Sequence, residues 1–179
     1  MPPYSPKHPC FRTLEQVAED VAYVLKAPLT EGTKFAVLNN ACWAWTEFGG
    51  KYQGCPRWTK LAMLRRCVAF KNGLKRRFEG LRREHAVPRS LVIELLRNLD
   101  TPTPTSVYEI CNKFLHGVVV TKEEDDILNC LYRKHMPSEF FDPTSPEYHD
   151  PFLRYKRCEI EIVEPLENWW LNIPVAIQS

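Results

Sequence analysis

The sequence predicts a mainly α-helical protein with one small β element. Apolar residues recur every three or four positions over most of the first 135 residues, and three segments have the residues of a helix capping box. Only two short runs have the pattern of strands. At 179 residues and 44% hydrophobic content, the chain is long enough to bury a sizeable core. We expect a single domain, in which residues 1–135 are mainly helical and residues 136–179 form an irregular tail packed on them.

Two helices are expected before residue 50. Thr13 and Gln16 have the spacing at which two side chains satisfy free N–H groups of a first helical turn, and the apolar pattern that follows them stops before Pro28. A second helix is expected from Thr33 to Gly49-Gly50, because glycine readily adopts the left-handed conformation that ends a helix.

Helical spacing continues through the basic middle of the chain. The apolar positions from Leu61 to Leu81 predict one long helix, or two that join near Gly73, with basic residues on the other face. Pro88 has no N–H to donate and restricts the preceding residue, so it should interrupt this helix. A new helix is then expected up to Asn98.

The C-terminal half has two more capping boxes and two candidate strands. The boxes begin at Ser106 and Thr121, and each should open a helix. Residues 118–120 are expected to be extended, and the alternating residues 158–164 are predicted to pair with them. Between these elements, residues 138–151 contain several prolines and are expected to form a surface loop anchored by aromatic side chains, namely Phe140, Phe141 and Tyr148.

The cysteines and the ends of the sequence indicate a cytoplasmic protein. The 7 cysteines include no C-x-x-C pair, and this pattern favours reduced thiols. Of these, Cys42, Cys67 and Cys111 fall on apolar helical faces and should be buried. The sequence lacks the features of a secretory signal, and no apolar run approaches the roughly 20 residues of a membrane span.

Basic residues are concentrated in one segment, residues 65–89, which we call the basic segment. It contains nine basic and two acidic residues and therefore has a net charge of +7, whereas the whole chain has a net charge of only +2. A surface of this kind attracts phosphates. DNA or RNA is therefore the expected partner, and the candidate binding residues are Arg65, Arg66, Lys71, Lys75, Arg76, Arg82, Arg83 and Arg89. The alternatives are a solvated helix face and a face that packs on the acidic remainder of this protein or on an acidic protein partner.

The residues Glu84-His85-x-x-Pro88 resemble the first half of the HNH, or ββα-metal, nuclease motif. The resemblance implies cleavage of nucleic acid with one divalent metal ion, Mg²⁺ or Zn²⁺, with His85 as general base and Glu84 as a metal ligand. The second half of such a motif would be supplied by Asn112 and His116, whose spacing of four residues places them on one face of a helix. The resemblance covers only about seven residues of the first half.

A non-catalytic function is the competing hypothesis. The densest aromatic group of the chain lies beside Lys51 and Arg57. Such a group can stack on unpaired bases, but it can also form core or anchor a protein partner. In the competing hypothesis, the basic segment binds an acidic protein and the aromatic group anchors it. The group consists of Trp43, Trp45, Phe48, Tyr52 and Trp58.

Overall fold

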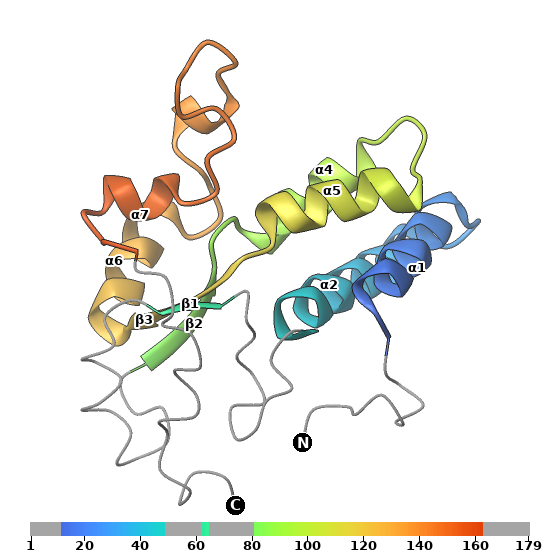
Figure 1. The fold of residues 1–179 in the computed structure, drawn as a ribbon, viewed down its shortest axis with the longest axis horizontal. Coiled ribbons are helices and arrows are strands. Elements are labelled where there is room, and N and C mark those ends of the chain that lie inside the picture. Colours follow the sequence, from blue (N-terminus) through green and yellow to red (C-terminus); the bar gives the residue numbers. More distant parts are fainter. Residues whose placement is uncertain (1–11, 49–61, 65–80, 163–179) are drawn as a thin grey trace, which may run out of the picture.

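The computed structural model describes residues 12–48, 62–64 and 81–162. The fold is mostly helical with one small sheet, as the sequence predicted (Figure 1). The described elements are α1 (Leu14–Lys26), α2 (Glu31–Phe48), β1 (Ala62–Leu64), β2 (Leu81–His85), α4 (Arg89–Arg97), α5 (Pro104–Phe114), β3 (Gly117–Thr121), α6 (Lys122–Tyr132), the 3₁₀ helix η2 (Ser138–Phe141) and α7 (Leu153–Arg157).

Two of the three predicted capping boxes are confirmed. The Gln16 N–H donates to the Thr13 hydroxyl at 3.2 Å while the Gln16 side chain accepts from the Thr13 N–H at 2.8 Å, and Thr121 forms the same box at α6. The box predicted at Ser106 is wrong, because α5 begins three residues earlier than that box implies. Its N-cap is Thr103, and Pro104 fits the first helical position, where no N–H is needed.

The sheet has the strand order β1-β3-β2, so β3 is its central strand. β3 runs parallel to β1 and antiparallel to β2, and its pairing with β2 sets His85 opposite Gly117. The extended conformation predicted for residues 118–120 is therefore confirmed.

The partner predicted for β3 is wrong. Its neighbours come from residues 62–64 and 81–85, for which the apolar spacing predicts helix. The helical prediction fails there because pairing with the valines of β3 outweighs the local pattern. Residues 65–80, with Gly73, lie outside the described residues.

The alternating residues after α7 do not join the sheet within the described part of the chain. The chain turns at Glu159, which has a positive φ of 55°, and the N–H of Ile160 donates back to the carbonyl of Tyr155 at 2.8 Å. Ile160 is buried by this turn. Its apolar side chain thus contributes to a core without forming a strand.

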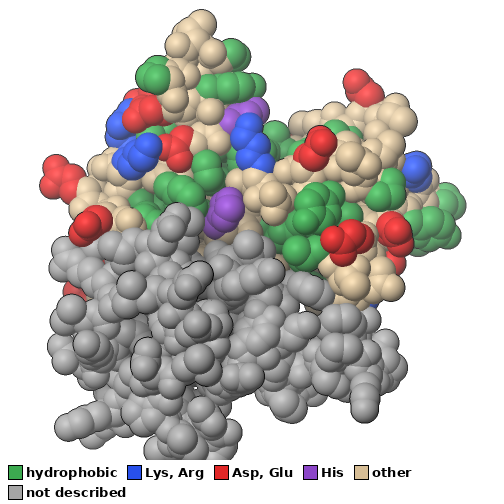
Figure 2. Space-filling view, viewed as in Figure 1, with side chains coloured by type: hydrophobic (Ala, Val, Ile, Leu, Met, Phe, Trp, Pro, Cys, Tyr) green, Lys and Arg blue, Asp and Glu red, His purple; other side chains and the backbone are tan. Residues whose placement is uncertain are grey.

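Among the described residues, two groups of buried side chains hold the fold together. The larger group lies among α1, α2, α4 and α5; the α1 residues in it, Val17, Ala18, Val21 and Ala22, are at most 2% exposed. The smaller group joins the sheet to α6 and α7. Cys42 and Cys111 are buried as predicted, whereas Cys67 lies outside the described residues. Figure 2 shows a hollow on one face between the two sets of elements, with histidine and lysine or arginine side chains at its base.

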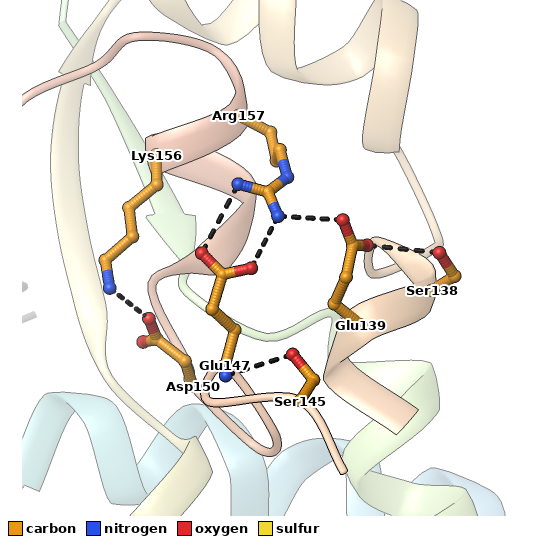
Figure 3. Close-up of polar contacts among 7 residues, drawn as sticks. All are labelled: Ser138, Glu139, Ser145, Glu147, Asp150, Lys156 and Arg157. Atoms are coloured by element: carbon orange, nitrogen blue, oxygen red, sulfur yellow. Dashed lines mark hydrogen bonds and ion pairs between the residues drawn. The ribbon is translucent and has the colours of Figure 1, made fainter. Parts of the chain in front are cut away.

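The proline-rich segment after α6 is a loop with one short 3₁₀ helix. Ion pairs to α7 hold it: Arg157 binds both Glu139 and Glu147, and Lys156 binds Asp150 (Figure 3). Hydrogen bonds from its own backbone and from Arg157 lower the pKa of Glu139 to about 2. The loop is therefore fixed to the helix that follows it.

The helices of the described part of the chain are too short or too polar to span a membrane.

The three aromatic residues of the loop are not equivalent. Phe140 is completely buried and belongs to the larger core, whereas Phe141 is 51% exposed and Tyr148 is 42% exposed. Phe140 is thus the anchor of the loop, and the other two rings face solvent over much of their surface.

Candidate functional site

The two segments predicted to carry catalytic residues meet through their backbones. The N–H of Ala86, at the end of β2, donates to the carbonyl of His116 at 2.8 Å, and His85 pairs with Gly117 across the sheet. This contact follows from the antiparallel pairing of β2 with β3. Local sequence does not predict this contact, because the apolar spacing of these residues predicts helix where the structure has β2.

The His85 side chain lies against α2. It is 6% exposed, its Nε2 lies 3.2 Å from the Thr46 hydroxyl, and its ring meets the Trp43 ring edge-on at 4.6 Å. The Thr46 hydroxyl donates to backbone carbonyls within α2, at Cys42 and Trp43. Because this hydroxyl has a single hydrogen, which is directed at these carbonyls, it can accept from the Nε2–H of His85.

Glu84 contacts a different part of the protein. Successive residues of a strand point to opposite faces of a sheet, so Glu84 lies on the side away from His85. Its carboxylate pairs with the Arg154 guanidinium of α7 at 3.4 Å. Burial raises the pKa of Glu84, Arg154 lowers it and Asp125 raises it, and the net direction is upward.

Arg154 is a buried cation at the centre of this region. Its side chain is 2% exposed and donates to the carbonyl oxygens of Ala86 at 3.0 Å, Tyr132 at 2.8 Å and His85 at 2.5 Å. It thereby joins α7 to the end of β2 and the end of α6. Its role could not be predicted from local sequence, since it lies 68 residues from Ala86.

Asn112 and His116 do not share a helical face, so that prediction is wrong. α5 ends at Phe114 and the chain then enters β3, which leaves His116 beyond the helix. Asn112 is exposed. The His116 Nε2 donates to the carbonyl of Lys113 at 2.9 Å and its ring lies 5.2 Å from that of Phe152, while burial lowers its pKa.

The predicted metal ligands therefore have separate neighbours. Glu84 pairs with Arg154, His116 lies against Phe152 and Asn112 faces solvent. Within residues 12–48, 62–64 and 81–162, no group of three or more His, Cys, Asp and Glu side chains could hold a metal ion.

Three of the predicted nucleic-acid-binding residues lie in the described part of the chain. Arg82 is exposed on β2, and Arg83 is the next residue of that strand. Arg89, at the start of α4, lies over the Trp43 ring at 4.4 Å and donates to the Asn39 side chain at 2.7 Å. The other five lie outside the described residues, namely Arg65, Arg66, Lys71, Lys75 and Arg76.

The contact of Arg89 with α2 fixes its guanidinium in a half-buried position. Asn39 and Trp43 are four residues apart and so present their side chains on one face of α2. Burial lowers the pKa of Arg89, yet a guanidinium stays protonated in proteins. The spacing of Asn39 and Trp43 is enough to predict that they share a helical face. Their contact with Arg89 could not be predicted in this way, because Arg89 lies 50 residues from Asn39 in the sequence.

The fold and these contacts define a mostly helical protein in which a small sheet joins two helical groups. Comparisons of the chain with models of protein families, with characterised proteins and with solved structures gave no match.

Proposed function

We propose that the protein binds nucleic acid through the basic segment. The observation that carries this proposal is the concentration of nine basic and two acidic residues within residues 65–89 of a chain that is otherwise net acidic. In the described part of this segment, Arg82 is exposed and Arg89 is half-buried. Arginine side chains in such positions can bind phosphate oxygens with two N–H groups at once.

The Arg89–Trp43 pair supports the proposal. The contact holds the guanidinium plane near an aromatic ring that is itself only partly buried. A cation fixed in this way loses less conformational freedom when it binds a phosphate than a cation on a freely rotating side chain.

Replacing Arg82 with glutamine should weaken binding to oligonucleotides of any sequence. Each phosphate contact that is lost should reduce the slope of log affinity against log salt by about 1. Fluorescence anisotropy with labelled single-stranded DNA, duplex DNA and RNA, measured from low to high salt, gives both quantities. Lys26→Gln, at the exposed end of α1, is the matched control and should leave the slope unchanged.

Absence of binding at low salt, or binding without salt dependence, would rule out the proposal. An acidic protein would then be the better partner for the basic segment, and the competing non-catalytic hypothesis would replace nucleic-acid binding.

Metal-dependent cleavage is a second candidate function. It is favoured by the backbone contact between the end of β2 and His116. It is also favoured by the order of the elements, since β2 carries Glu84 and His85 and is followed, after Pro88, by α4. In this form His85 is the general base. The candidate ligands for Mg²⁺ or Zn²⁺ are Glu84, Asn112 and His116, which have separate neighbours in this structure and would have to come together to hold the ion.

His85→Gln should abolish cleavage if this second function is correct. Glutamine can still donate to Thr46 but cannot take up a proton at neutral pH, so the expected loss in rate is about 10²- to 10⁴-fold. The measurement is cleavage of the labelled oligonucleotides with added Mg²⁺ or Zn²⁺, with Lys26→Gln purified in parallel. An unchanged metal-dependent rate in His85→Gln would exclude His85 as the base.

A further inference from the structure

A pocket of about 300 Å³ lies between α4 and the segment that follows α6. In Figure 1 this segment rises beside α4 before it enters the proline-rich loop. The pocket is separate from the contacts of His85 and Glu84. It is lined by Ser90, Leu91, Glu94, Lys134, His135, Met136 and Phe141.

Four of the residues that line this pocket have polar side chains. Ser90, Glu94, Lys134 and His135 are all exposed, and the structure gives none of these described side chains a hydrogen bond or ion pair. Glu94 and Lys134 have opposite charges, yet they lie beyond ion-pair distance of one another within the same lining. The pocket therefore offers a hydroxyl, a cation, an imidazole and a carboxylate to a ligand.

The remaining lining is apolar and includes an aromatic ring. Met136 is 5% exposed, whereas Phe141 is 51% exposed and meets the buried ring of Phe140 edge-on at 5.1 Å. The edge contact holds the Phe141 ring in place. Its exposed surface can then stack on a flat ligand group.

We propose that this pocket binds a nucleoside monophosphate, either free or as the phosphorylated end of a strand. Lys134, His135 and Ser90 would bind the phosphate, Phe141 would stack on the base, and Glu94 would accept from a sugar hydroxyl or a base amino group. The volume is at the lower end of the range for small-molecule pockets, about 300–1,000 Å³.

The lining disfavours the neighbouring ligand classes. An inorganic anion would leave Phe141 and Glu94 without a contact, and a purely apolar ligand would remove four polar groups from water without hydrogen bonds. A triphosphate would bring further negative charge close to Glu94. Lys134 is the one lysine in the described lining, so it alone would have to offset that charge.

Calorimetry with adenosine monophosphate, adenosine and inorganic phosphate on the full chain tests the pocket. Adenosine monophosphate should bind more tightly than either fragment. Lys134→Gln should weaken it by about 10- to 100-fold, to the level of adenosine, because a charge-assisted hydrogen bond is lost. Phe141→Ala should weaken it towards the level of phosphate. Lys26→Gln is the control for loss of an exposed positive charge.

Equal binding of the three ligands, no binding of adenosine monophosphate, or unchanged affinity in Lys134→Gln would overturn the proposal. The two sources of the ligand are separated by comparing oligonucleotides with and without a terminal phosphate. Tighter binding of the phosphorylated strand, lost in Lys134→Gln, identifies a strand end; equal binding of both strands identifies the free nucleotide. The strand-end case rests on the proposed function, whereas binding of adenosine monophosphate can succeed even if Arg82 proves irrelevant to oligonucleotides.

Discussion

Replacing Arg154 with alanine is expected to lower the free energy of unfolding by about 3–5 kcal/mol, because the change leaves buried polar groups without partners. The guanidinium satisfies the backbone carbonyls of His85, Ala86 and Tyr132 and is almost completely excluded from solvent. Urea unfolding followed by circular dichroism measures the loss. Arg154→Lys should also be strongly destabilising, since one ammonium group cannot reproduce the geometry of the guanidinium.

Glu84→Gln is the matched control for this prediction. It removes only the 3.4 Å ion pair and leaves the three carbonyl contacts of Arg154 in place. Burial already raises the pKa of Glu84 and disfavours its ionised form, so the loss should be about 1 kcal/mol or less. If Arg154→Ala costs no more than Glu84→Gln, the carbonyl contacts do not stabilise the fold as argued.

The helices could be predicted from the sequence because the signals for them are local. At α1 and α6, a hydroxyl and a second polar side chain three residues later satisfy the first-turn N–H groups, and both boxes form as expected. The error at α5 has the same local origin. Ser106 belongs to the box but occupies its third helical position, since Thr103 and Pro104 start the helix earlier.

The sheet could not be predicted because its pairings are non-local. Leu81 to His85 are apolar and charged residues with no strand alternation, and they become β2 only by pairing with β3, some 35 residues away along the chain. Glu84 and His85 of the nuclease-like motif are successive residues of β2, so their side chains lie on opposite faces of the sheet. The sequence showed that Glu84 and His85 are neighbours, but it did not show that one would contact α7 and the other α2.

The candidate pocket likewise could not be predicted from the sequence. Its lining comes from α4, from the residues after α6 and from η2, and none of its polar residues forms a local motif. The sequence predicts that Phe141 anchors the loop together with Phe140. The structure separates these adjacent rings into one buried in the core and one exposed beside the pocket.

Phe140→Ala is expected to destabilise the protein by about 3–5 kcal/mol, the range for removing a fully buried aromatic side chain. The Phe140 ring lies 5.7 Å from that of Phe114 and 5.3 Å from that of His149, so its loss leaves a cavity between α5 and the loop. Phe141→Ala should change the free energy of unfolding by about 0.5 kcal/mol, as for surface substitutions. Urea unfolding of the two variants provides a matched comparison of neighbouring phenylalanines.

The same pair of variants separates folding from binding. Phe140→Ala should weaken adenosine monophosphate binding indirectly, because it unfolds the loop that carries Phe141. An added osmolyte stabilises the folded state, so it should restore the affinity together with the fold. Phe141→Ala should lose affinity in a protein of normal stability, and osmolyte should restore nothing. If both variants lose stability equally, the loop is anchored by both rings, and the exposed face of Phe141 is not available to stack on a base.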